Sequence, residues 1–230
     1  MRPRVEALLL DFDGIVADSE RENAGLLRAF FRDRFGIGIT EDDERSVCGF
    51  PWPETFAALF GRYSIAVSPA EAWRLFFPVK LARLSEHPMR TATGLRELAD
   101  LPVAKALVSG SHRGEIEAML ASAGHPHLGI DFMICREDVS RSKPDPEGFL
   151  AACSRLDVPP AEALAFEDSR PGIAAARAAG TAVAFVRELA PEDNAGLADA
   201  AFDTLADAVP WIRERLGPGR IHHCIRWIGI

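Results

Sequence analysis

The stretch Val5–Ser19, VEALLLDFDGIVADS, decides the fold. It begins with an apolar run that only Glu6 interrupts, and it ends abruptly in the sequence DFDG at residues 11–14. A short apolar run that stops at charge and glycine is typical of a buried strand in a parallel sheet. Ligands bind beyond the carboxyl ends of the strands in such sheets. Because positions i and i+2 of an extended chain face the same way, Asp11 and Asp13 are expected to point at one place there.

A plain polar turn after a strand is the alternative for residues 11–14, because Asp and Gly are common turn residues. Two carboxylates that lie close together repel each other unless a cation or a proton lies between them. A glycine at residue 14 lets the backbone turn sharply or approach a ligand. Residues 11–14 alone do not distinguish a polar turn from a ligand-binding site, and the rest of the sequence is needed for that.

The composition is that of a globular protein with one large domain, or a domain that carries an insertion. The 230 residues are 48% hydrophobic and 26% charged, with a formal net charge of −8. This acidic balance argues against a nucleic-acid partner. No apolar run is long enough to span a membrane, and the N-terminal stretch does not resemble a signal peptide. The four cysteines are scattered without a C-x-x-C pair, which indicates reduced thiols and a cytoplasmic protein.

The hydrophobic pattern divides the chain into two parts. Residues 16–87 carry apolar side chains at helical spacing, with a first helix that Asp18 or Ser19 caps and a second that starts at Thr40. A break at residues 49–53 precedes a short helix over 54–60. From residue 88 onward, helices alternate with short apolar runs at 103–108, 132–135, 163–166, 182–186 and 200–202. This alternation predicts right-handed crossovers and a parallel sheet.

We therefore expect an α/β core that is discontinuous in sequence, made of residues 1–15 and 88–230. A helical domain of residues 16–87 is inserted after the first strand. The tail at residues 217–230 fits neither pattern. Its His222, His223 and Cys224 are residue types that bind metals, but an edge strand or a poorly ordered end is the simpler interpretation.

Two further segments of the predicted core carry polar residues suited to an anion. Ser109 directly follows an apolar run, and its hydroxyl and the backbone N–H groups near Gly110 suit an anionic group. A serine at this point also fits a turn or a helix cap. Lys143 lies directly before Pro144 and is one of only three lysines in a chain rich in arginine. A lysine there indicates that a compact point charge is required.

Carboxylates recur at another strand end, where Glu167, Asp168 and Ser169 follow the apolar run at 163–166. Capping of the next helix explains Ser169 or Asp168 alone, but not why acids, a hydroxyl and a lysine all recur. Carboxylate oxygens together with a phosphate are ligands that Mg²⁺ prefers. Phosphoryl transfer requires a nucleophile, a proton-handling group and neutralisation of charge. A carboxylate nucleophile forms an acyl phosphate that water hydrolyses, and a second acid can handle both protons.

Four segments resemble the motifs of the haloacid dehalogenase superfamily. They are DFDGIVADS, the strand-ending Ser109, the segment KPDP at residues 143–146 and the segment FEDSRPGIAAARAAG that begins at residue 166. The resemblance runs in the right order from Val5 to about Phe202, and the helical insertion resembles the cap of subfamily I. It implies a Rossmann-like parallel-sheet core with an inserted α-helical cap domain.

The resemblance also implies roles for individual residues. Asp11 corresponds to the nucleophile and Asp13 to the acid/base, while Ser109 and Lys143 correspond to residues that bind the transferring phosphoryl group. The second acid, Asp13, separates phosphotransferases from true dehalogenases, which lack it. The implied enzyme is a phosphoric monoester hydrolase that acts on a small phosphorylated metabolite, such as a sugar phosphate or a phosphoglycolate-like compound, through an aspartyl-phosphate intermediate.

A Mg²⁺ cofactor is implied by the same resemblance. Its ligands correspond to Asp11, the backbone carbonyl of Asp13, Glu167 and Asp168.

A β-phosphoglucomutase-like isomerase is the enzymatic alternative, because it uses the same core. Such mutases place a histidine twelve residues after the nucleophile and an arginine three residues beyond the glycine of a cap loop. Asn23 and Trp52, which follows Gly49 at that spacing, stand at these positions here. Asn does not titrate near neutrality as histidine does, and Trp cannot bind a second phosphate with two hydrogen bonds as arginine does. Both residues therefore favour hydrolysis over isomerisation. Asn23, Gly49 and Trp52 are the candidate substrate-binding residues of the cap, although Trp52 fits a place inside the cap equally well.

A non-enzymatic alternative is a receiver domain of the kind that signalling proteins phosphorylate. Receiver domains also combine acids, a hydroxyl and a lysine at a parallel sheet edge. They are much shorter, have no helical insertion, and carry the phosphorylated aspartate on a later strand. The insertion in this chain favours an active-site lid, which excludes water and contacts the substrate.

Overall fold

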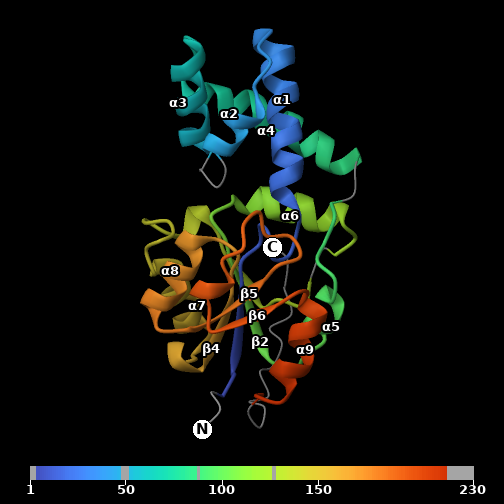
Figure 1. The fold of residues 1–230 in the computed structure, drawn as a ribbon, viewed down its shortest axis with the longest axis vertical. Coiled ribbons are helices and arrows are strands. Elements are labelled where there is room, and N and C mark those ends of the chain that lie inside the picture. The colour runs from blue at the N-terminus through green and yellow to red at the C-terminus, as the bar shows by residue number, and fades with distance from the viewer. Residues whose placement is uncertain (1–3, 48–51, 87–88, 126–127, 217–230) are drawn as a thin grey trace, which may run out of the picture.

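A computed structural model describes residues 4–47, 52–86, 89–125 and 128–216. A six-stranded parallel sheet in the order β3-β2-β1-β4-β5-β6 forms the lower part of the molecule in Figure 1. The strands are β1 (Ala7–Leu10), β2 (Ala104–Val108), β3 (Phe132–Ile134), β4 (Ala163–Phe166), β5 (Ala182–Val186) and β6 (Ala200–Phe202). The predicted α/β fold with a parallel sheet is confirmed.

Helices cover both faces of the sheet. They are α5 (Leu95–Ala99), α6 (Arg113–Ser122), α7 (Glu147–Leu156), α8 (Arg170–Ala179) and α9 (Leu205–Arg213), with short 3-10 helices η1 (Arg136–Asp138), η2 (Pro160–Glu162) and η3 (Ala195–Leu197) between elements. Leu8 and Leu10 of β1 pack in one core cluster with side chains of α5, α6 and α9. Ala7 and Leu9 point to the other face and pack with side chains of α7 and α8. Burial on both faces explains why the central strand is a continuous apolar run.

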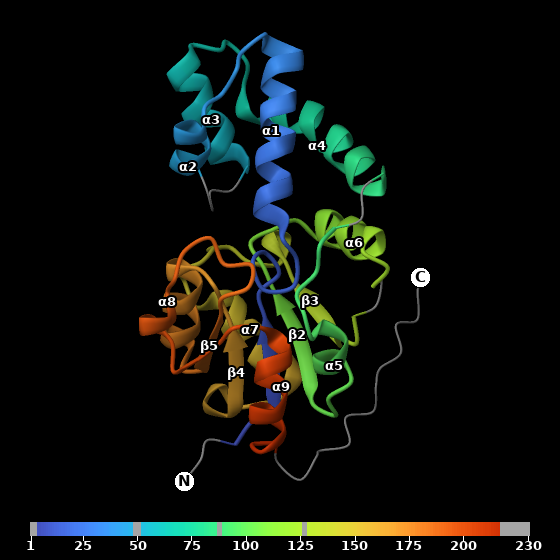
Figure 2. The same cartoon turned by 45° about the vertical axis from the view of Figure 1, so that its right-hand side comes forward.

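The strand register aligns the polar residues that follow the strands. Leu10 lies opposite Leu107 of β2 and Phe166 of β4. The backbone N–H of Asp11 then donates to the carbonyl of Phe166 at 3.0 Å. Asp11 is therefore level with Glu167, at the edge of the sheet that faces the inserted helices (Figure 2).

The insertion after β1 forms the helices α1 (Ser19–Phe35), α2 (Glu41–Val47), α3 (Trp52–Tyr63) and α4 (Pro69–Glu86). They stand above the carboxyl edge of the sheet in Figure 1 and have a buried aromatic cluster of their own. Its rings include Phe30, Phe56 and Phe76, whose centroids lie 5.2–5.9 Å apart. No helix in the described part of the chain is long and apolar enough to cross a membrane.

Two local predictions about the insertion are wrong. Asp18 is at the N-cap position of α1, but its side chain makes no capping hydrogen bond, and the hydroxyl of Ser19 donates instead to Asp13. The predicted break over residues 49–53 also extends too far, because α3 already begins at Trp52. Proline is tolerated in the first turn of a helix, where its missing N–H has no intrahelical partner, so Pro53 does not delay the start.

The chain passes between the sheet and the inserted helices twice, and the two crossings pair with each other. Ala17 forms an antiparallel bridge with Thr91, and the N–H of Asp18 donates to the carbonyl of Arg90 at 3.0 Å. Glu188, after β5, accepts hydrogen bonds from the N–H and the hydroxyl of Thr93, both at 2.8 Å. The crossings are thus joined to each other and to the core.

The carboxylate of Asp43 joins the start of α2 to the end of α3. It is fully buried and accepts hydrogen bonds from Tyr63 at 2.6 Å and from the N–H and hydroxyl of Thr40 at 2.7 Å. Nε of Arg62 lies 2.9 Å from its other oxygen. Burial alone would raise the pKa of Asp43, but these hydrogen bonds and the Arg62 charge outweigh burial and lower the pKa to about 2. The predicted helix start at Thr40 with Asp43 is confirmed.

We expect Asp43→Asn to lower the free energy of unfolding at neutral pH by roughly 1.5–3 kcal/mol, the range for hydrogen bonds to charged groups. A carboxyl group whose pKa is lower in the folded state stabilises the protein above its unfolded pKa of 3.8, and this stability is lost as the pH falls towards 2. Urea denaturation of both proteins as a function of pH tests this expectation. A stability difference that stays constant as the pH falls through this window would contradict it.

Candidate active site

The carboxyl ends of β1, β2 and β4 bring most of the predicted residues together. Asp11 follows β1, Ser109 follows β2, and Glu167 and Asp168 follow β4. All four are buried. Lys143 reaches the same place from the loop between η1 and α7. The rule that parallel strands end at one edge of the sheet explains this convergence.

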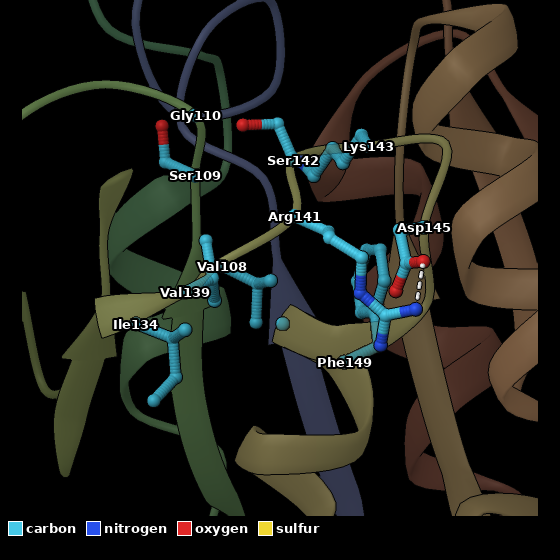
Figure 3. A pocket seen from close by; sticks show the side chains of 11 residues that line it. Val108, Ser109, Gly110, Ile134, Val139, Arg141, Ser142, Lys143, Asp145 and Phe149 are labelled. Atoms are coloured by element: carbon cyan, nitrogen blue, oxygen red, sulfur yellow. Dashed lines mark ion pairs between the residues drawn. The ribbon is translucent and has the colours of Figure 1, made fainter. Parts of the chain in front are cut away.

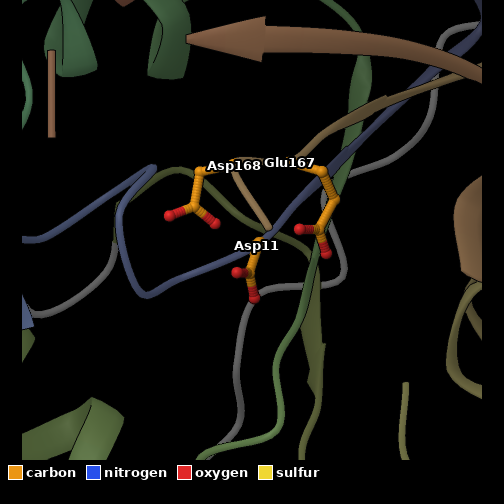
Figure 4. A group of neighbouring side chains, drawn as sticks. All are labelled: Asp11, Glu167 and Asp168. Atoms are coloured by element: carbon orange, nitrogen blue, oxygen red, sulfur yellow. The ribbon is translucent and has the colours of Figure 1, made fainter. Parts of the chain in front are cut away.

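Three carboxylates form a buried acidic group at this edge (Figure 4). Oxygens of Asp11, Glu167 and Asp168 all lie within 4.8 Å of one another. Burial, followed by the charge of Glu167, raises the pKa of Asp168 to about 8. The same two causes raise the pKa of Asp11 well above its usual range, and Lys143 opposes them only in part. The protein neighbours therefore do not neutralise this group when all three carboxylates are ionised, and the raised pKa values favour protonation or a bound cation.

Lys143 is the cation of this group. Its Nζ lies 2.7 Å from Oδ1 of Asp11 and 2.5 Å from Oε1 of Glu167. Burial alone would lower the pKa of Lys143, but the charges of Asp11 and Glu167 outweigh burial and raise it. The lysine is therefore a fixed positive charge next to Asp11.

A pocket lies beside Lys143 (Figure 3). Ser109, Gly110 and Lys143 line it together with apolar side chains from β2, β3 and α7. Gly110 is exposed, and a Cβ at this position would meet nothing within 4 Å. Arg141 and Asp145 also line the pocket and pair with each other at 3.1 Å. Open space next to a hydroxyl and an ammonium group suits a small anionic group.

Asp13 has different neighbours from the three buried acids. Its side chain is half-buried and accepts hydrogen bonds from the hydroxyls of Ser111 at 2.8 Å and Ser109 at 3.3 Å, both on Oδ2. The hydroxyl of Ser19 donates to Oδ1. Three hydroxyls from two segments thus hold the Asp13 carboxylate in one orientation.

The candidate residues of the insertion lie as follows. Asn23 is in the second turn of α1 and is half-buried. Trp52 begins α3, packs against Phe76 at 4.6 Å between ring centroids, and donates from Nε1 to Oε1 of Glu115 at 3.1 Å. This contact joins the insertion to α6 of the core. Gly49 and the tail at residues 217–230, with its candidate metal-binding side chains, lie outside the described residues.

Sequence reasoning missed three neighbours of these groups. Ser111 and Ser19 both bind Asp13, and only Ser111 had a signal, since it is two residues from Ser109 in the same turn. The buried Asn194 donates from Nδ2 to the backbone carbonyl of Asp168 at 2.8 Å. Twenty-six residues separate these two positions, and no motif connects them, so only the folded chain shows the contact.

Comparison with known proteins adds independent support for the expected family. Residues 8–186 match the family described as haloacid dehalogenase-like hydrolase. A validoxylamine A 7'-phosphate phosphatase from Streptomyces hygroscopicus subsp. limoneus is 36% identical over 180 residues, which cover 75% of this chain and 81% of that protein. An N-acetylmuramic acid 6-phosphate phosphatase from Pseudomonas aeruginosa is 31% identical over 205 residues, which cover 84% of this chain and 87% of that protein.

A solved structure has the same fold as this chain. The crystal structure of a putative beta-phosphoglucomutase from Thermotoga maritima aligns with a TM-score of 0.74 at 26% identity, covering 91% of this chain and 99% of that one. The relatives named as phosphatases agree with the expected enzyme class, a phosphoric monoester hydrolase. The family match spans the sheet from β1 to β5 together with the whole helical insertion. The chain belongs to the haloacid dehalogenase-like hydrolase family.

Proposed function

We propose that this protein is a Mg²⁺-dependent phosphatase that hydrolyses a small phosphorylated metabolite through an aspartyl phosphate on Asp11. The observation that carries the proposal is the buried group of Asp11, Glu167 and Asp168 with the ammonium of Lys143 beside it. Relatives named for validoxylamine A 7'-phosphate and N-acetylmuramic acid 6-phosphate support a sugar phosphate or a similar ester as the substrate class.

Asp11 is the nucleophile in this proposal. One of its carboxylate oxygens forms a bond to phosphorus, and the bond between phosphorus and the ester oxygen breaks. Lys143, 2.7 Å from Oδ1 of Asp11, holds positive charge where the phosphoryl oxygens gather. Ser109 donates its hydroxyl to the same phosphoryl group once it turns from Asp13.

Asp13 is the acid/base of both half-reactions. Its protonated form gives a proton to the leaving alcohol, so the alcohol departs neutral. The resulting carboxylate takes a proton from a water molecule, and the hydroxide oxygen bonds to phosphorus. The bond between phosphorus and Asp11 then breaks, which releases inorganic phosphate and restores both acids. The hydroxyls of Ser19 and Ser111 keep Asp13 in place during these steps.

The chemistry of the acidic group fits Mg²⁺. Asp11, Glu167 and Asp168 offer hard oxygen ligands. Burial, followed by the charge of Glu167, raises the pKa of Asp168 to about 8, and a bound cation would favour the ionised carboxylates. These residues would hold the ion together with the backbone carbonyl of Asp13, as the family resemblance implies. When bound, Mg²⁺ supplies positive charge to the transferring phosphoryl group.

Two glycines leave room for the acids in this arrangement. Gly14 has φ +75°, and a Cβ there would lie 2.0 Å from Oδ2 of Asp168. Gly172, in the first turn of α8, would place a Cβ 1.9 Å from Oε2 of Glu167. A larger residue at either glycine would overlap the carboxylate of Asp168 or Glu167 as it now lies. Glycine at both positions is therefore required by the present places of these two acids.

Helices α1–α4 act as a cap over the site in this proposal, and residues 16–87 correspond to that cap. The paired crossings at Ala17 and Thr91 form the hinge of the cap in this proposal. A cap excludes bulk water during transfer and contacts the part of the substrate that distinguishes one ester from another.

A β-phosphoglucomutase-like isomerase is the second candidate, because a solved structure with that printed name shares the fold. Asn23 stands where such mutases place a histidine, and Trp52 where they place an arginine. The Nε1 donor of Trp52 is engaged with Glu115 in the described arrangement. These features favour hydrolysis, and the two activities differ in whether inorganic phosphate is released.

Phosphate release from a panel of sugar phosphates and other small phosphate esters, assayed with Mg²⁺, tests the proposal. We expect Asp11→Asn to lower turnover by roughly 10³-fold or more, because an amide oxygen is a poor nucleophile. A chelator should abolish the activity, and circular dichroism should show that the variant is folded. Unchanged phosphate release by folded Asp11→Asn, or in excess chelator, would exclude the mechanism, and conversion of a sugar phosphate to its isomer would favour the mutase.

A matched pair of glycine variants tests the metal site without an activity assay. Gly14 and Gly36 have φ of +75° and +70°, but a Cβ at Gly36 would meet nothing within 4 Å. Both Gly14→Ala and Gly36→Ala carry the strain of a left-handed alanine, about 1–2 kcal/mol. Only Gly14→Ala displaces Asp168, so we expect it alone to weaken Mg²⁺ binding, by about tenfold or more in calorimetry. Equal Mg²⁺ affinity in the two variants would show that Asp168 is not a ligand.

A further inference from the structure

Helix α4 of the insertion lies against helix α6 of the core (Figures 1 and 2). Trp73 and Lys80 lie on one face of α4, seven residues apart. The ring of Trp73 stacks on His112, with centroids 5.5 Å apart, and the ammonium of Lys80 pairs with Glu115. The cap and the core therefore share a second interface, and charged groups lie inside it.

Glu115 contacts the cap with one oxygen and the core with the other. Its Oε1 accepts hydrogen bonds from Nζ of Lys80 and from Nε1 of Trp52 at 3.1 Å, both from the cap. Its Oε2 accepts from the backbone N–H of His112 at 3.1 Å, which closes the capping box of α6. Nζ of Lys80 also lies 4.8 Å from the ring centroid of Trp52. Glu115 is 0% exposed and Lys80 is 1% exposed, so both charges are fully withdrawn from water.

The loop that Glu115 holds is the one that orients Asp13. His112 directly follows Ser111, whose hydroxyl donates to Oδ2 of Asp13 at 2.8 Å, and Ser109 donates to the same oxygen at 3.3 Å. An unbroken series of contacts thus runs from Lys80 in the cap through Glu115 and His112 to Asp13. We propose that Glu115 is a positioning residue that makes the orientation of Asp13 depend on the docking of the cap.

Burial makes this dependence strong. A buried ion pair that loses one partner leaves an uncompensated charge, which is strongly unfavourable. The docked arrangement therefore requires both Lys80 and Glu115, whereas an open cap exposes both groups to water. When the cap leaves α6, Glu115 loses the partners that hold its Oε1, and the carboxylate is free to turn from the N–H of His112. Asp13 is then least well held when no substrate is enclosed.

The test compares Glu115→Gln and Lys80→Met with Asp43→Asn. Asp43 is a matched control, because, like Glu115, it is a fully buried carboxylate with a cationic partner, here Arg62. Its described partners all belong to the cap, so its loss does not affect the interface with the core. Hydrogen–deuterium exchange of the segment 109–113 is the first readout. We expect faster exchange there in Glu115→Gln and in Lys80→Met, although Lys80 is on another helix, and wild-type exchange in Asp43→Asn. Unchanged exchange in both interface variants would overturn the proposal.

The second readout is the hydrolysis of p-nitrophenyl phosphate, which rests on the proposed phosphatase activity. We expect both interface variants to lower kcat by roughly tenfold to hundredfold, as small misplacements of a reacting group do, with little change in KM. Asp43→Asn should lower stability and leave kcat unchanged. Equal losses of kcat in all three variants would mean that the ion pair only stabilises the cap. If the wild type hydrolyses no ester, the proposed function fails, while the exchange experiment still decides the coupling.

A double variant shows whether Glu115 acts through the serine loop. Glu115→Gln should lower kcat much less in a Ser111→Ala background than in the wild type, because Ser111→Ala already removes the contact through which Glu115 acts. If the fold-losses of kcat in the two single variants multiply in the double variant, Glu115 does not act through Ser111. If the single variants do not fold, Lys80→Met/Glu115→Met removes both charges and leaves none unpaired. Its segment 109–113 should still exchange faster than in the wild type, and wild-type exchange there would overturn the proposal.

Discussion

The constraint on which the site depends is the burial of three carboxylates beside a single ammonium group. Asp11, Glu167 and Asp168 lie within 4.8 Å of one another, and Lys143 pairs with two of them. Like charges at this spacing oppose folding unless a cation or protons compensate them. Other features of the core position these carboxylates. The register of β1 against β4 sets Asp11 beside Glu167, and Gly14 leaves the space that Asp168 fills.

The sequence was sufficient for the features that depend on burial and on sheet direction. The runs at 163–166, 182–186 and 200–202 are strands with the expected bounds. The first two are buried, because a strand covered on both faces must be apolar along its length, whereas 200–202 is a partly exposed edge strand. The meeting of Asp11, Ser109 and Glu167 followed from one rule, that parallel strands end at the same edge. Such predictions need no knowledge of how individual side chains pack.

Contacts that depend on how one helix docks on another were out of reach. Nothing in the local sequence says that Lys80 meets Glu115, because the pairing depends on the angle at which α4 crosses α6. Trp52 had two interpretations, and its ring packs among the cap aromatics, while its Nε1 donates to Glu115 of the core, a contact that neither interpretation included. The capping role expected for Asp18 or Ser19 failed for a more local reason. The hydroxyl of Ser19 donates to Asp13, six residues earlier in the chain, and helix propensity does not predict that contact.

The hydrogen bonds of Asp13 divide the proposed chemistry between two parts of the molecule. The proposed nucleophile and metal-binding acids, such as Asp11, are held by β1, β4 and the loop of Lys143, all within the core. The proposed acid/base is held differently. Ser19, which donates to Oδ1 of Asp13, is the first residue of the first cap helix, and Ser111, which donates to Oδ2, precedes the core helix on which the cap docks. The start of the first cap helix and the loop before α6 therefore each hold one oxygen of Asp13. Under the proposed mechanism, a change in the position of the cap alters the hydrogen bonds of the proposed acid/base, so the proposal links enclosure of the substrate to proton transfer through one carboxylate.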